Sequence, residues 1–220
     1  MINSTSSASE YRPKSFNDMI GQDAIVKTLN NAIKNDNIPQ ALLFCGPRGV
    51  GKTSCARIHA KTINNLEDDF EYNIFELDAA SNNSVEDIRN ITDQIRIPPQ
   101  TGRYKVYIID EVHMLSNQAF NAFLKSLEEP PEHVVFILAT TEKNKILPTI
   151  LSRCQIYDFK KVDNESIIKL LSKICKEKKV KYEDGSLSLI AERSDGSISC
   201  LLYTSPSPRD QRGSRMPSSA

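Results

Sequence analysis

Residues 41–53 read Ala-Leu-Leu-Phe-Cys-Gly-Pro-Arg-Gly-Val-Gly-Lys-Thr, and this stretch decides the fold. Its first five residues form an apolar run, which is typical of a short buried strand. Residues 46–53 then fit the pattern Gly-x-x-x-x-Gly-Lys-Ser/Thr, and residues 51–63 read as a helix. A strand, a glycine-rich loop and a helix in this order predict a phosphate-binding loop.

The residue types in this loop suit the binding of a nucleotide. Glycines let the backbone wrap around a phosphate, and free N–H groups at the helix start point toward the anion. Lys52 supplies a cation to the outer phosphates, and Thr53 offers a hydroxyl to Mg²⁺. The alternative is a glycine-rich turn beside an exposed lysine. The predicted nucleotide-binding residues of this segment are Gly46, Gly49, Gly51, Lys52, Thr53 and Ser54.

Strand and helix patterns alternate along the first 160 residues. The predicted strands are 41–45, 73–77, 105–109, 133–139 and 155–159. Between them, Ser84 and Asp87 have capping-box spacing and open a helix to about Arg96. Ser116 caps a further helix that ends before Pro130, and a short helix leads to Ser152. This alternation predicts an α/β fold with a parallel sheet that is covered by helices on both faces.

Two strand ends carry polar residues with a possible role in phosphate chemistry. Asp110 and Glu111 follow the apolar strand at 105–109, at the edge where open α/β sheets bind ligands. Asp110 is expected to hold Mg²⁺, and Glu111 to polarise a water for attack on the γ-phosphate. Thr140 and Thr141 end the next strand, where a hydroxyl could sense the γ-phosphate or position the water. Which of the two acts stays open, and we name Thr141 as the candidate. The alternative is that the acids are solvated and that the threonines merely suit strand ends.

The composition is ordinary for a globular protein. The 220 residues are 39% hydrophobic and 25% charged, with 28 basic and 28 acidic side chains. There is no apolar run of membrane-spanning length and no secretory signal pattern, so we expect a cytoplasmic protein that does not engage a membrane. The five cysteines lack metal-site spacing, and we interpret the three histidines as structural or solvated.

The pattern changes after about residue 160. Apolar residues at helical spacing follow Asp163, and residues 187–191 indicate another helix. Residues 1–160 are therefore expected to form the nucleotide-binding domain, and residues 161–199 the start of a small helical domain. Residues 200–220 are rich in Ser, Pro and Arg and have little to bury, which predicts a disordered tail.

The chain resembles AAA+ ATPases, and within them the gamma/tau subunits of the bacterial DNA polymerase III clamp loader. The resemblance covers about residues 11–198. The segments that carry it are YRPKSFNDMIGQ (11–22), GPRGVGKT (46–53), ELDAASNNSVEDIR (76–89), YIIDEVHMLS (107–116), FNAFLKSLEEPPEHVVFILATTE (120–142) and ILPTILSRCQ (146–155). The Ser-Arg-Cys triplet and the DEVHML segment narrow it to clamp loaders.

The resemblance implies further roles. Arg153 would be an arginine finger that reaches ATP on a neighbouring subunit, with no anionic partner in its own chain. The alternative is an arginine that caps a helix end or pairs with a local carboxylate. Tyr11, Arg12 and Ile20 would line the adenine end of the site, or simply pack the domain rim. Residues 81–89 would face DNA. The implied partners are other loader subunits, the sliding clamp and primer-template DNA.

The sequence departs from the family in two places. Residues 63–75 contain no cysteine where many relatives carry a four-cysteine zinc module, so we expect ATP and Mg²⁺ but no zinc. Ser199 stands where the family has a lid arginine that reaches ATP, and the tail from Cys200 onward is foreign to the family. Two alternatives therefore remain open: a different AAA+ DNA-processing motor, such as a helicase loader or Holliday-junction type, and a nucleotide-binding fragment without turnover.

Overall fold

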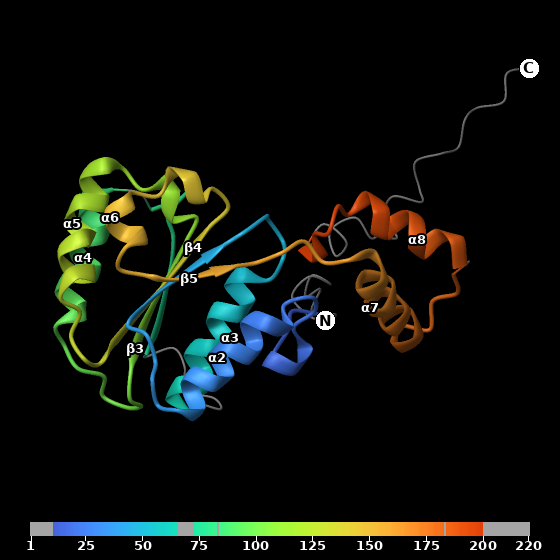
Figure 1. The fold of residues 1–220 in the computed structure, drawn as a ribbon, viewed down its shortest axis with the longest axis horizontal. Helices are drawn as coiled ribbons and strands as arrows, with labels where there is room; N and C mark the ends of the chain where they lie inside the picture. Colours follow the sequence, from blue (N-terminus) through green and yellow to red (C-terminus); the bar gives the residue numbers. More distant parts are fainter. Residues whose placement is uncertain (1–10, 66–72, 83, 183, 200–220) are drawn as a thin grey trace, which may run out of the picture.

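The computed structural model describes residues 11–65, 73–82, 84–182 and 184–199. The predicted tail at 200–220 lies outside them. Labels follow Figure 1. The elements are η1 (Phe16–Asp18), α2 (Asp23–Lys34), β1 (Ala41–Cys45), α3 (Lys52–Asn64), β2 (Ile74–Asp78), α4 (Val85–Ile95), β3 (Lys105–Asp110), η2 (Val112–Met114), α5 (Asn117–Glu128), β4 (Val134–Thr140), η3 (Lys143–Lys145), α6 (Pro148–Leu151), β5 (Gln155–Asp158), α7 (Asn164–Glu177) and α8 (Asp184–Arg193).

The five described strands form one sheet in the order β2-β3-β4-β1-β5, and every pairing is parallel. Strands β1 and β4 are buried along their whole length, as the apolar runs predict for a sheet covered on both faces. Figure 1 shows α2 and α3 on one face and α4, α5 and α6 on the other. The two faces bury separate hydrophobic clusters. The predicted α/β class is confirmed.

Helix starts are fixed by side-chain caps that the sequence predicts. The Ser84 hydroxyl accepts a hydrogen bond from the Asp87 backbone N–H, and the Asp87 carboxylate accepts one from the Ser84 N–H. The Ser116 hydroxyl caps α5 by accepting a hydrogen bond from the Ala119 backbone N–H. Such caps satisfy N–H groups that have no partner inside the helix. The predicted starts of α4 and α5 are therefore confirmed.

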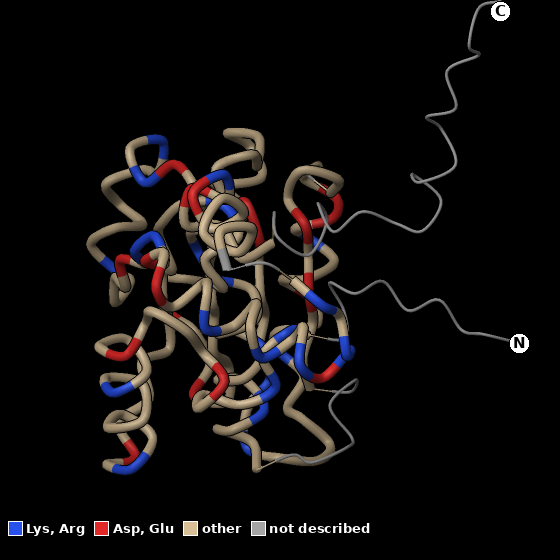
Figure 2. Tube along the Cα trace, turned by 90° about the vertical axis from the view of Figure 1, so that its right-hand side faces the viewer, with Lys and Arg blue, Asp and Glu red and all other residues tan. Residues whose placement is uncertain are grey.

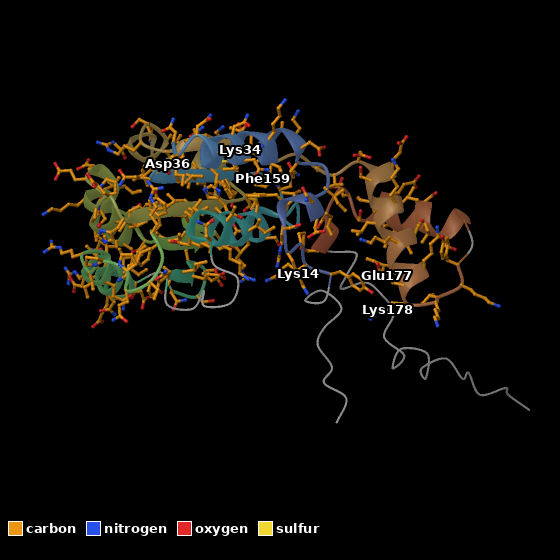
Figure 3. All side chains as sticks on the ribbon, turned by 90° about the horizontal axis from the view of Figure 1, so that it is seen from below. Lys14, Lys34, Asp36, Phe159, Glu177 and Lys178 are labelled. Atoms are coloured by element: carbon orange, nitrogen blue, oxygen red, sulfur yellow. The ribbon has the colours of Figure 1, made fainter. Side chains whose placement is uncertain are left out.

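Helices α7 and α8 lie to one side of the sheet, beyond β5 (Figure 1). They bury a small cluster of their own around Val162, Ile167 and Ala191. The N-terminal segment reaches this region, because the Lys178 ammonium lies 5.5 Å from the Tyr11 ring centroid. Figure 3 shows the segment that carries Lys14 and, at the end of α7, the side chains of Glu177 and Lys178. The N-terminal segment thus connects the sheet domain to the helical part.

Candidate nucleotide-binding site

The glycine-rich loop joins β1 to α3 in a conformation that needs glycine. Gly46 and Gly49 have φ angles of +149° and +76°, in the region that residues with a side chain rarely adopt. A Cβ on Gly46 would lie 2.5 Å from the Phe159 carbonyl oxygen. A Cβ on Gly49 would lie 2.1 Å from Ser197 Oγ. The loop backbone therefore lies in close contact with Phe159, directly after β5, and with Ser197 of the helical part.

Lys52 begins α3 and is folded back over the loop. Its ammonium donates hydrogen bonds of 2.8 Å to the carbonyl oxygens of Gly46 and Pro47. The side chain is only 6% exposed. Burial lowers the pKa of Lys52 below its ordinary value, and the nearby carboxylates of Glu111 and Asp110 oppose that shift. Lys52 is therefore a desolvated cation at the mouth of the loop.

Thr53 and Asp110 are brought together from α3 and β3. The Thr53 hydroxyl donates a 2.6 Å hydrogen bond to Asp110 Oδ2. The other oxygen, Oδ1, accepts from the Glu111 backbone N–H at 3.0 Å. Ser54 follows on α3 and is half-buried. A hydroxyl and a carboxylate at hydrogen-bond distance beside a phosphate loop are the oxygen donors that Mg²⁺ prefers.

Glu111 and Thr141 form the second polar pair of this sheet edge. Glu111 Oε2 accepts hydrogen bonds from the Thr141 backbone N–H at 3.2 Å and from its hydroxyl at 3.0 Å. The Glu111 backbone is left-handed, with φ at +47°. Such a conformation costs a non-glycine residue roughly 1–3 kcal/mol and is concentrated at functional sites. Of the two candidate threonines, Thr141 is therefore the one that contacts the acid.

His113 is a site residue that sequence reasoning missed. Its Nδ1 lies 3.0 Å from Thr140 Oγ1 and 3.4 Å from Glu111 Oε2, and Nε2 lies 3.3 Å from Glu142 Oε1. The side chain is 6% exposed. The signal available in the sequence was that His113 follows Glu111 by two residues. This spacing alone does not predict a contact, because the two side chains meet through the turn at η2.

The predicted adenine-end residues lie in the segment before α2. Met19 packs beneath the phosphate loop, with its methyl group 3.0 Å from the position of a Cβ on Gly51. Ile20 is half-buried against the small cluster of the helical part. Tyr11 is half-buried and Arg12 is exposed. The structure thus brings the 19–20 stretch to the loop, and the adenine-binding role of Tyr11, Arg12 and Ile20 stays a prediction.

The helical part also contacts the phosphate loop. The Ile198 backbone N–H donates a 2.9 Å hydrogen bond to the Gly49 carbonyl oxygen. The Ser199 Cβ lies 3.1 Å from the position of a Cβ on Gly49. Ser199, the position at which the resemblance led us to expect a lid arginine, therefore lies directly beside the loop.

Arg153 lies away from this site, at the amino ends of the parallel strands, whereas the phosphate loop lies at their carboxyl ends. Its guanidinium donates 2.9 Å and 2.6 Å hydrogen bonds to Glu128 Oε1 and the Thr149 carbonyl oxygen. The expectation that Arg153 has no anionic partner in its own chain is therefore wrong. The physical reason is topological: α5 ends with Glu128 at the edge where β5 begins, which brings the two side chains together.

The residues of the site fit a Mg²⁺-nucleotide. The loop supplies a glycine cradle and a buried ammonium, and Thr53 with Asp110 supplies oxygen donors for the metal. Among the described residues, no three His, Cys, Asp or Glu side chains gather in a group that could hold a metal ion. Part of the segment that replaces the zinc module, 66–72, lies outside those residues, so the absence of zinc stays a prediction.

Three further findings concern the described part of the chain. Its helices are all too short or too polar to cross a membrane. Its four cysteines, Cys45, Cys55, Cys154 and Cys175, are unpaired with one another. Acidic and basic residues are interspersed over the trace (Figure 2).

Solved structures with the same fold include two proteins of Thermotoga maritima. The RuvB Holliday junction branch migration motor of Thermotoga maritima matches with a TM-score of 0.70 at 23% identity, over 88% of this chain and 63% of that one. A DNA polymerase III gamma subunit-related protein of the same organism matches with a TM-score of 0.53 at 24% identity, over 76% and 58%. The chain shares the α/β fold of these structures, with the phosphate loop between β1 and α3.

In sequence, the chain is similar to the gamma and tau subunits of DNA polymerase III. It is 47% identical to the tau subunit of Bacillus subtilis, over 86% of this chain and 36% of the relative. It is 43% identical to tau of Escherichia coli, over 87% and 32%, and to gamma of Buchnera aphidicola, over 87% and 56%. Residues 71–163 match the family described as DNA polymerase III, delta subunit. The chain thus spans about a third of the tau relatives.

Proposed function

We propose that the chain is an ATP-binding and ATP-hydrolysing subunit of the DNA polymerase III clamp loader. It would couple ATP to the loading of a sliding clamp on primer-template DNA in the cytoplasm. The names of its homologues support this assignment. The observation that carries the chemistry is the pairing of Thr53 with Asp110, and of Glu111 with Thr141, at the edge of the sheet that holds the phosphate loop.

The loop residues bind and orient the nucleotide in this proposal. Backbone N–H groups at the start of α3 donate hydrogen bonds to the phosphate oxygens, and the helix N-terminus favours their negative charge. Lys52 exchanges its bonds to the Gly46 and Pro47 carbonyls for the outer phosphates. Thr53 and Asp110 would hold Mg²⁺, which would neutralise charge on the phosphates.

Glu111 and Thr141 serve the water that attacks the γ-phosphate. Glu111 leaves its bonds to Thr141 and accepts a hydrogen bond from the water, which it orients and polarises. The Thr141 hydroxyl is then free to contact the γ-phosphate. The left-handed backbone of Glu111 supports this role, since it fixes the direction in which the side chain leaves the strand.

Arg153 acts in trans, on ATP bound by a neighbouring subunit. Its position supports this, because it precedes β5 while the phosphate loop follows β1. In the register of the two strands, Gln155 pairs with Leu42 and Asp158 with Cys45. Arg153 therefore lies at the amino ends of these strands, and its own phosphate loop lies at their carboxyl ends. A strand rises about 3.3 Å per residue, which puts the guanidinium out of reach of its own nucleotide. When no neighbouring subunit is bound, Arg153 forms its ion pair with Glu128.

The division into domains is part of the proposal. Residues 1–160 form the nucleotide-binding domain and residues 161–199 belong to a helical lid. The hydrogen bond from Ile198 to Gly49 supports a lid that responds to the loop. Residues 81–89, which include the start of α4, are the surface we assign to DNA. The partners are other loader subunits, the clamp and primer-template DNA.

The test is a steady-state ATPase assay with the partner loader subunits present. We expect turnover that rises when the clamp and primer-template DNA are both added. Lys52→Ala should abolish it, with Lys61→Ala on the same helix as the matched control. Stimulation by a Holliday junction instead would favour the branch-migration motor. Binding of ATP without turnover under every condition would favour a nucleotide-binding fragment.

A further inference from the structure

The Arg153 guanidinium is held by two different elements of its own chain. Its Nη2 donates a 2.9 Å hydrogen bond to Glu128 Oε1, at the end of α5. Its Nη1 donates a 2.6 Å hydrogen bond to the Thr149 carbonyl oxygen, in α6. A guanidinium is planar and rigid, so bonds to two separate elements fix the direction of its plane as well as its position.

Glu128 presents its carboxylate from a firmly packed base. Leu127, directly before it on α5, is 3% exposed. The chain leaves the helix through Pro130 and Pro131, whose carbonyl oxygens accept hydrogen bonds from Gln40 Nε2 at 3.4 Å and 2.9 Å. Proline also restricts the backbone directly after the helix. Because the chain is anchored on both sides of Glu128, the end of α5 is a fixed support for the guanidinium.

The bond to Glu128 leaves part of the guanidinium uncommitted. Arg57, by comparison, binds both oxygens of Glu76 through Nε and Nη2. Arg153 binds one oxygen of Glu128 through Nη2, and its Nη1 is used within residues 149–152. Of the five N–H groups of an arginine, that of Nε and the second of Nη2 have no acceptor among the described residues. These two donors remain for an anion from another subunit.

The pair also lies where such an anion can reach it. Arg153 and Glu128 line a surface hollow of about 430 Å³ at the amino ends of the strands, together with Pro39, Gln40 and Gln155. The Arg153 side chain remains 35% exposed. A phosphate that enters from a neighbouring subunit can therefore meet the guanidinium while its bonds to α5 and α6 stay in place.

We propose that Glu128 is a positioning residue, which fixes the direction of the Arg153 guanidinium at the subunit interface and so raises the turnover of ATP bound by the neighbour. The inference rests on the proposed function, in which Arg153 acts in trans. A long side chain loses rotamer freedom when it binds, and an arginine that is already fixed loses less. The opposite role would be a restraint, in which the carboxylate competes with the phosphate. The single-oxygen bond and the two remaining donors favour positioning.

The first test measures how firmly Arg153 is held, by nitrogen-15 NMR of the arginine side chains in the chain alone, with assignment from Arg153→Lys. The observable is the rate of rotation about the Nε–Cζ bond. Glu128→Ala should speed this rotation about fivefold, the upper range for a partly exposed ion pair. Glu128→Gln keeps a carbonyl acceptor and should stay closer to the parent, and Glu129→Gln, an exposed neighbour, should match it. Equal rates in the parent and Glu128→Ala overturn the inference.

The second test places Glu128→Ala in one or the other of two inactive variants that are mixed in the reconstituted loader. Lys52→Ala supplies only the arginine, and Arg153→Ala supplies only the phosphate loop. In the Lys52→Ala chain, Glu128→Ala should lower kcat of the mixture about fivefold and leave KM for ATP within about twofold. In the Arg153→Ala chain it should change neither constant, because that chain supplies no guanidinium. A purely structural role would lower turnover from either chain.

Two control variants complete the mixing test. In the Lys52→Ala chain, Glu128→Gln should retain most of the turnover, and Glu129→Gln should match the mixture without a further substitution. Equal losses from both chains, no loss from either, or faster turnover with Glu128→Ala contradict the inference. If the mixture of Lys52→Ala and Arg153→Ala shows no turnover at all, the proposed function fails, and the NMR result still decides whether Glu128 fixes Arg153.

Discussion

His59 makes stability depend on pH in a way that one substitution should remove. It lies on α3 with 0% exposure, and its ring centroid is 6.4 Å from that of Phe16. Both ring nitrogens are buried without a hydrogen-bond partner among the described residues. Burial lowers the pKa of His59 from 6.5 to about 4, because the apolar surroundings disfavour the charged imidazolium.

The sign and size of the effect follow from linkage. The folded pKa lies below the unfolded one, so the unfolded chain binds more protons between pH 6.5 and about 4. The free energy of unfolding therefore holds its full value above pH 6.5 and decreases as the pH falls toward 4. At about 1.4 kcal/mol per pKa unit, the loss is about 3 kcal/mol.

The assay is urea unfolding of the parent and His59→Leu over this pH range. At neutral pH the variant should be at least as stable, because leucine removes two buried polar atoms that have no partner. As the pH falls to about 4, its advantage should grow by about 3 kcal/mol. Ile63→Val, a core change on the same helix, should cost about 1 kcal/mol at every pH. Parallel curves for the parent and His59→Leu would refute the reasoning.

Three further predictions concern the loop, the Arg153 ion pair and a helix cap. Gly49→Ala places a Cβ 2.1 Å from Ser197 Oγ at a φ of +76°, so titration with a fluorescent nucleotide should show at least about tenfold weaker binding. Glu128→Gln should lower stability by less than about 1 kcal/mol in denaturant, since its pair with Arg153 is partly exposed; a larger loss would contradict this. Ser84→Ala should cost about 1 kcal/mol, whereas Ser84→Asn should retain most of the cap.

The strands and caps were predictable because their signals are local. Runs of apolar residues predict β1, β3 and β4 within one residue, since a parallel strand buries both faces. Ser84 and Ser116 predict helix starts because a serine hydroxyl accepts a hydrogen bond from a backbone N–H group of the first helical turn. Helix α2 was not predicted, although Ile25, Leu29 and Ile33 repeat at helical spacing.

The candidate site was predictable in its residues and only partly in its contacts. The pattern at 46–53 and the acids after β3 identify Thr53 and Asp110, and the parallel sheet brings them within 2.6 Å. The contact of His113 with Glu111 depends on the left-handed turn at Glu111, which has no glycine to mark it. The pairing of Arg153 with Glu128 depends on where two distant elements end, and no local spacing encodes that.

The most direct test of the central claim is a mixing experiment on two inactive variants. Lys52→Ala lacks a working phosphate loop but keeps Arg153, and Arg153→Ala has the opposite defect. If one chain supplies the loop and its neighbour the arginine, an equimolar mixture in the reconstituted loader should regain ATP turnover that neither variant shows alone. Light scattering should verify that both variants assemble. A mixture that assembles and stays inactive would contradict the account.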